Sequence, residues 1–189
     1  MPRLSRHWNQ RETPRSADQT ASALSVNIWK LASDALLALE NEGFETADWS
    51  QRLDVIGHFA IFGVHLTDRE TWMRLPDEER GRLIPSLAKH LAALMQDNRL
   101  GCDGPGEHAT RFIEQLNAQS EIYAGGQWSA EEGPGFALCR ELGDAVAGSM
   151  EERDREWIVT YVIDREAPKF ATALQKVLRS LVASGRQLA

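Results

Sequence analysis

The segment from Arg52 to Leu66 most constrains the fold of this chain, because it is apolar on almost every side when drawn as an α-helix. At about 100° per residue, its titratable groups fall into one stripe within about 40° of one another. That stripe consists of Asp54, His58 and His65. A helix that is apolar over most of its circumference is buried by other elements, so we expect it at the centre of a helical domain.

The rest of the chain after Ser22 repeats apolar residues with a period of about 3.6, which is typical of helices that bury one face. No segment of useful length alternates apolar and polar residues as a half-buried strand does. The sequence therefore predicts an all-α fold, an irregular bundle of about seven to eight helices. The clearest boundaries are predicted at about 23–42, 107–124 and 136–147.

Several helix ends are predicted from local signals. Gly43 ends the first helix, and Thr67–Glu70 has the form of a capping box that starts a fresh short helix. A second capping box at Ser149–Glu152 opens a helix near the C-terminus. Pro85 and Pro168 are expected to kink or break the helices that contain them, because proline lacks the backbone N–H.

Residues 1–21 differ in composition from the rest and predict a disordered basic tail. This tail is poor in apolar residues, and Pro14 argues against the amphipathic helix of an organelle transit peptide. Residues 22–189 are expected to form a single helical domain, with the glycine-rich loop at 101–106 as a seam between halves. The tail contains four arginines, Arg3, Arg6, Arg11 and Arg15, and the only acidic residue among its first fifteen positions is Glu12.

Composition limits the classes of partner. A chain of 189 residues that is 42% hydrophobic is long enough to bury a sizeable core. Its net charge of −7 argues against general nucleic-acid binding, which draws on clustered Lys and Arg. Charges interrupt every apolar run before it reaches membrane-spanning length. Two unpaired cysteines, Cys102 and Cys139, favour a reducing compartment, so we expect a cytoplasmic protein.

The titratable stripe has three interpretations. It is the exposed edge of a mostly buried helix, a structural polar contact in which His58 bonds to Asp54, or a site for a divalent metal that also uses His65. A metal ion would need ligands from a facing helix, and His90 and Asp97 have suitable positions for that role. The metal site is the alternative that leads to an enzyme.

A second enzyme hypothesis places a nucleophile at Cys102, six residues before His108 at a predicted helix start. Asp103 and Glu107 would oppose the thiolate, so this hypothesis is the weaker one. The glycines of the same loop do not form a phosphate-binding turn, because no strand precedes them.

Tryptophans point to a binding role. Trp128 lies in a loop bordered by glycines and Trp8 lies in the basic tail, so both are candidates for anchoring a partner. We interpret the remaining tryptophans as core residues; they are Trp29, Trp49, Trp72 and Trp157. The function expected from these features is a protein-binding or assembly and adaptor module without catalysis or cofactor, acting on a protein partner or on a second copy of itself.

One stretch resembles a known family. Arg52–Ile56 and His58–Phe62 are similar to the early helix of the ubiquinol–cytochrome c chaperone family, whose members are helical assembly factors for a membrane complex. The resemblance covers only about a tenth of the chain. It implies a chaperone-like binding role and no particular site residues.

Overall fold

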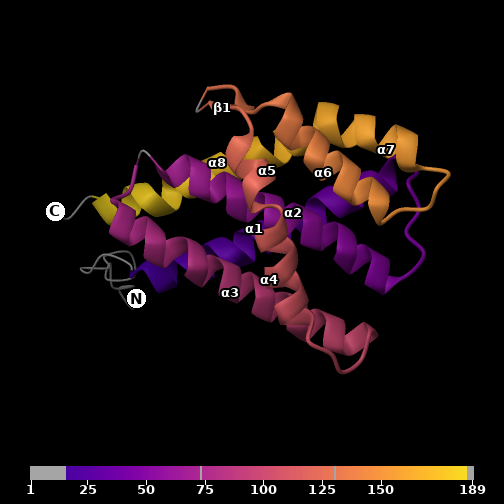
Figure 1. Ribbon diagram of the computed structural model, residues 1–189, viewed down its shortest axis with the longest axis horizontal. Helices are drawn as coiled ribbons and strands as arrows, with labels where there is room; N and C mark the ends of the chain where they lie inside the picture. Colours follow the sequence, from indigo (N-terminus) through magenta and orange to yellow (C-terminus); the bar gives the residue numbers. More distant parts are fainter. Residues whose placement is uncertain (1–15, 73, 130, 187–189) are drawn as a thin grey trace, which may run out of the picture.

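The computed structural model describes residues 16–72, 74–129 and 131–186, and within them nearly all regular structure is helical (Figure 1). The only strands in these ranges are two residues long each and pair in an antiparallel hairpin. The elements in chain order are α1 (Ala17–Asn41), α2 (Trp49–Trp72), α3 (Asp77–Cys102), α4 (His108–Ala118), α5 (Ser120–Gly125), β1 (Trp128–Ser129), β2 (Gly133–Pro134), α6 (Phe136–Gly148), α7 (Arg155–Tyr161), the π-helical turn η2 (Val162–Glu166) and α8 (Ala167–Arg186).

The all-α prediction is confirmed, but the number of helices is smaller than predicted. Gln119 alone separates α4 from α5, and α7, η2 and α8 follow one another without a gap. The described residues therefore form six continuous helical rods instead of about seven to eight. The predicted break at Pro168 is absent because the wider turn of η2 directly precedes this proline and accommodates its missing N–H.

Other predicted helix ends are also wrong. Helix α2 continues through Thr67 to Trp72, and the buried Thr67 hydroxyl donates to the carbonyl of Gly63 at 2.7 Å instead of capping a new helix. Helix α3 runs through Pro85, so of the two expected outcomes, a kink or a break, the break is absent. Ser149 lies at the C-terminal end of α6, and α7 begins only at Arg155.

The first helix begins inside the predicted tail. Ser16 accepts a hydrogen bond from the backbone N–H of Gln19 at 3.1 Å, and the Gln19 side chain accepts one from the Ser16 N–H at 3.2 Å. This reciprocal capping box starts α1 at Ala17, so residues 17–21 are helical. The predicted stop is confirmed at Gly43, which has a φ of 95°.

Helix α2 lies at the centre of the bundle, as expected from its apolar circumference. It contacts α1, α3, α6 and α8, and its Phe59, Ile61 and Phe62 side chains are fully buried. The rings of Phe59 and Phe62 lie 5.6 Å and 5.9 Å from the ring of Phe170 in α8. Around this centre the buried apolar residues of all the longer helices form one continuous core.

Gly63 of α2 lies against side chains of both α1 and α8. A Cβ atom at Gly63 would lie 2.9 Å from Cγ2 of Ile28 in α1 and 3.2 Å from Cζ of Phe170 in α8. The absence of a side chain at Gly63 thus permits close packing of α2 against α1 and α8. Within the described ranges, no helix combines the length and apolar character needed to cross a membrane.

Candidate functional site

The predicted stripe on α2 divides between two separate sites. Asp54 and His58 line a pocket of about 240 Å³ between α2, α3 and α4, whereas His65 lines a larger groove further along the helix. His65 follows His58 by two turns, which displaces it by about 10 Å along the helix axis. A shared angular position on a helix therefore did not bring the three side chains into one site.

Arg99 of α3 is the centre of the polar cluster around Asp54. Its guanidinium forms an ion pair with the half-exposed Asp54 carboxylate, and it donates to Asp103 at 2.6 Å and to the Ser50 hydroxyl at 3.3 Å. Burial lowers the pKa of Arg99, but the hydrogen bond to Asp103 and the charge of Asp54 outweigh it and raise that pKa. No local sequence pattern pairs Arg99 with Asp54, because 45 residues separate them.

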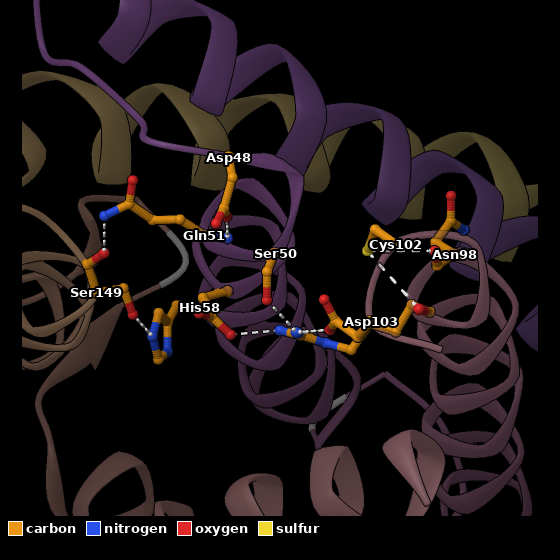
Figure 2. Close-up of polar contacts among 10 residues, drawn as sticks. Asp48, Ser50, Gln51, His58, Asn98, Cys102, Asp103 and Ser149 are labelled. Atoms are coloured by element: carbon orange, nitrogen blue, oxygen red, sulfur yellow. Dashed lines mark hydrogen bonds and ion pairs between the residues drawn. The ribbon is translucent and has the colours of Figure 1, made fainter. Parts of the chain in front are cut away.

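His58 faces the C-terminal end of α6. Its Nε2 lies 2.8 Å from the Ser149 hydroxyl, and Gln51 Nε2 donates to the Ser149 carbonyl at 2.7 Å, as Figure 2 shows. Burial lowers the pKa of His58, and the negative charge of Asp54 offsets only part of that effect. These contacts join α2 to the end of α6 through Ser149.

A serine beside an imidazole is also the first half of a nucleophilic site, so the third group matters. In a catalytic triad a carboxylate accepts a hydrogen bond from the histidine and fixes its orientation. Here the neighbouring carboxylate, Asp54, is engaged by Arg99 instead. The bond between His58 and Asp54 that the structural interpretation of the stripe predicted is not among the contacts of the described residues. His58 instead bonds to Ser149, and Asp54 pairs with Arg99.

The pocket beside this cluster contains further basic groups, of which the sequence singled out only His108, as a neighbour of Cys102. His108, Arg111 and Arg99 line it together with Asp54 and His58. The buried His108 ring lies with its Nε2 3.0 Å from the Gly104 carbonyl, a contact within the loop that precedes α4. Only the distant turns of α2, α3 and α4 bring these groups together, so no local motif marks them.

The arrangement of the described residues supports neither the metal hypothesis nor the nucleophile hypothesis. No group of three His, Cys, Asp or Glu side chains in the described ranges is placed to hold a metal ion. The predicted second-helix ligand His90 instead lies 3.0 Å from Asp18 of α1. Partial desolvation and, to a smaller extent, the neighbouring Asp103 raise the pKa of the Cys102 thiol. A raised pKa opposes the activation of this thiol as a nucleophile.

The groove that contains His65 also contains Trp128, so it unites two independent sequence predictions. It has a volume of about 670 Å³ and lies between the C-terminal end of α2, α5 and β1. Trp72 borders it with 57% of its surface exposed, and the half-buried Trp128 lines it from the hairpin. Tyr123 contributes a buried ring.

Tyr123 and His65 form the aromatic floor of this groove. Their rings stack with centroids 4.6 Å apart and planes 20° apart. Burial lowers the pKa of His65 to about 4, and a hydrogen bond to the backbone of Leu116 offsets part of that effect. The buried Nε2 of His65 has no hydrogen-bond partner among the described residues.

The charged residues around this groove are already paired. Arg69 donates to the carbonyls of Tyr123 and Gly126 at 2.8 Å and 3.1 Å and also to that of Ala124. Asp68 accepts from Arg80 at 2.6 Å. The buried Glu70 accepts from Gln175 at 2.6 Å and forms an ion pair with Arg74 at 2.9 Å. These bonds fix the polar edges of the groove and leave the aromatic rings as its open groups.

The tryptophans predicted to be core residues are mostly on the surface. Trp49, Trp72 and Trp157 are 64%, 57% and 72% exposed, and only Trp29 is half-buried against the core. Arginine side chains cover two of the exposed rings, with Arg80 4.3 Å above Trp72. Both Trp49 and Trp72 lie at ends of α2, where a ring can leave the core. The other predicted anchor, Trp8, lies outside the described residues.

Comparisons with protein-family models, with curated proteins and with solved structures find no match for this chain. The similarity of residues 52–62 to one helix of a chaperone family is therefore not extended by a family match. Function is argued from the site alone.

Proposed function

We propose that this chain is a protein-binding module, of the assembly or adaptor type and without catalysis of its own, which binds through the groove between Trp72 and Trp128. The observation that carries the proposal is the combination of open aromatic rings with charged neighbours that are already paired. Interfaces place aromatic side chains at their energetic centre, whereas this chain leaves a ring such as Trp72 uncovered by its own core.

The groove chemistry indicates the occupant. Because Asp68, Glu70 and Arg69 are engaged within the chain, an occupant needs no compensating charge. The stack of His65 on Tyr123 offers an apolar floor. A segment of another protein that inserts an aromatic side chain is complementary to this floor.

We further propose that the partner is a protein and that the chain acts in the cytoplasm. A net charge of −7 disfavours nucleic acid, so the partner is a protein. The two cysteines are free, one exposed and one buried, and a chain that keeps an exposed thiol reduced is suited to the cytoplasm. The chaperone-like role implied by the resemblance of residues 52–62 belongs to the same class of function.

Site-specific photocrosslinking in cells that naturally express the chain tests the proposal. A photoreactive amino acid replaces the exposed Ser120, which lines the groove, and a reference version carries it at Trp157, which is also exposed but lies outside the groove. We expect one discrete heterologous product from position 120 that Trp72→Ala abolishes and Trp49→Ala preserves. A product that survives Trp72→Ala contradicts the proposal. A crosslinked second copy of this chain replaces the proposed partner with a homo-oligomer.

A further inference from the structure

A groove between α1 and α8 gathers most of the lysines of the chain. Only four of the 21 basic residues are lysines, and three of them line this groove of about 610 Å³. They are Lys30 of α1 and Lys169 and Lys176 of α8. The fourth, Lys89, lies in a different groove between α3 and α4. A chain with a net charge of −7 thus carries a local basic surface.

Two of these ammonium groups are available to a partner. Lys30 and Lys176 are exposed and make no hydrogen bond or ion pair with the described residues. Lys169 contacts the buried Glu166 carboxylate at 3.3 Å. Asp34 is the single carboxylate among the described residues that line the groove. The groove therefore has an excess of positive charge that the chain itself does not neutralise.

The space between the lysines is mostly apolar. Leu31 of α1 and Ala173 and Val177 of α8 line it, and α1 packs against α8. The lining of α8 runs from residue 168 to residue 177, a length of about 14 Å, which matches two to three turns of another helix. An apolar strip with basic edges is complementary to an amphipathic helix with acidic edges.

The N-terminal segment of this chain has the wrong charge to occupy the groove. Residues 1–15 contain four arginines and one acidic residue, Glu12. This segment repels the lysines instead of complementing them. The occupant must come from another molecule.

We propose that the groove between α1 and α8 binds an acidic amphipathic helix of a partner protein. Its leucine-like side chains lie on Leu31, Ala173 and Val177, and its carboxylates approach Lys30 and Lys176. An anionic membrane shares the charge but not the shape, since a flat bilayer cannot enter a groove between helices, and the overall negative charge of the chain opposes approach to it. This inference does not depend on the groove between Trp72 and Trp128.

Fluorescence anisotropy with a designed peptide tests the inference on the full chain. The peptide is an amphipathic helix with leucine at i, i+3, i+4 and i+7 and glutamate on both flanks, and its matched partner has lysine in place of glutamate. We expect the glutamate peptide to bind in a salt-dependent manner and the lysine peptide not to bind. The double variant Lys30→Glu and Lys176→Glu should weaken binding at least about tenfold.

The fourth lysine supplies the matched control. Lys89→Glu changes the net charge in the same direction at another exposed position, and we expect it to leave the affinity within about twofold. Circular dichroism verifies that each variant is folded. Equal loss in Lys89→Glu, equal binding of the two peptides, or no binding of the glutamate peptide overturns the inference. Binding to phosphatidylglycerol vesicles alone, lost in the double variant, would assign the groove to a membrane instead. Trp72→Ala leaves peptide binding unchanged if the two sites are separate.

Discussion

At the scale of single residues, His65 combines burial, stacking on Tyr123 and a ring nitrogen without a hydrogen-bond partner among the described residues. The sequence placed this histidine on the correct face of α2 but linked it to Asp54 and His58 instead of to Tyr123. The reason is that helical periodicity gives an angle around the axis and carries no information about the neighbour at that angle. The distant Tyr123 and Trp128 define its surroundings, and no local pattern joins them to it.

The lowered pKa of His65 predicts acid sensitivity. Between about pH 6.5 and the folded pKa of about 4, the unfolded chain binds a proton on this ring and the folded chain does not. Its contribution is complete above about pH 6.5 and falls with decreasing pH, by up to about 3 kcal/mol near pH 4. His58 acts in the same direction, because its pKa is also lowered.

Urea denaturation at pH values from about 7.5 to about 4.5 measures this effect. We expect the free energy of unfolding of His65→Gln to fall less over this interval than that of the unchanged chain, because glutamine does not titrate. The same pH dependence in both proteins would contradict the assignment. Above about pH 7 the histidine is largely neutral in both the folded and the unfolded chain. The difference in the free energy of unfolding between the two proteins there therefore reports the loss of the stacked ring alone.

At the scale of helices, residue patterns predicted which segments are helical but not where several of them end. Thr67–Glu70 and Ser149–Glu152 have the letters of a capping box, yet Thr67 bonds back within α2 and Ser149 bonds to His58. The genuine box at Ser16 and Gln19 lies in a segment whose composition indicated disorder. A cap depends on the backbone reaching a non-helical conformation, and burial of the following turn decides that more than the motif does.

Two glycines on α2 give a matched test of helix packing. Alanine at position 63 meets Ile28 and Phe170, both core side chains, so we expect Gly63→Ala to lower the free energy of unfolding by about 1–3 kcal/mol. Alanine at position 57 meets only the terminal methyl of Met95 at 3.2 Å, which is able to move aside. Gly57→Ala should be neutral or stabilising by up to about 1 kcal/mol. Equal effects of the two substitutions in urea denaturation would refute the packing argument.

At the scale of the whole molecule, contacts between residues that are far apart in the sequence form the candidate sites. The all-α class followed from periodicity, whereas the pairing of Asp54 with Arg99 and of His58 with Ser149 requires knowledge of which helix faces meet. The exposed tryptophans show the same limit of prediction from sequence. Tryptophan is usually buried, and only the assembled bundle shows that Trp72 and Trp157 fall outside its core.

The bond between His58 and Ser149 is expected to hold the C-terminal helices to α2. Ser149→Ala leaves Nε2 of the half-buried His58 without its partner, so we expect a loss of about 1–2 kcal/mol in the free energy of unfolding. Hydrogen exchange should accelerate in α6 more than in α1. Ser33→Ala is the control, since the Ser33 hydroxyl donates only to the Trp29 carbonyl of its own helix. Equal exchange in α6 for both variants would show that the bond has no such role.

The uneven distribution of lysine has a practical consequence for the handling of this protein. Reagents that acylate amines modify Lys30, Lys169 and Lys176 together, because so few other side-chain amines compete for the reagent. A sensor surface or fluorophore attached by amine coupling would therefore neutralise the groove between α1 and α8 before any partner is added. Coupling through Cys102, the exposed one of two free thiols, leaves those charges in place and attaches the chain at a single defined point.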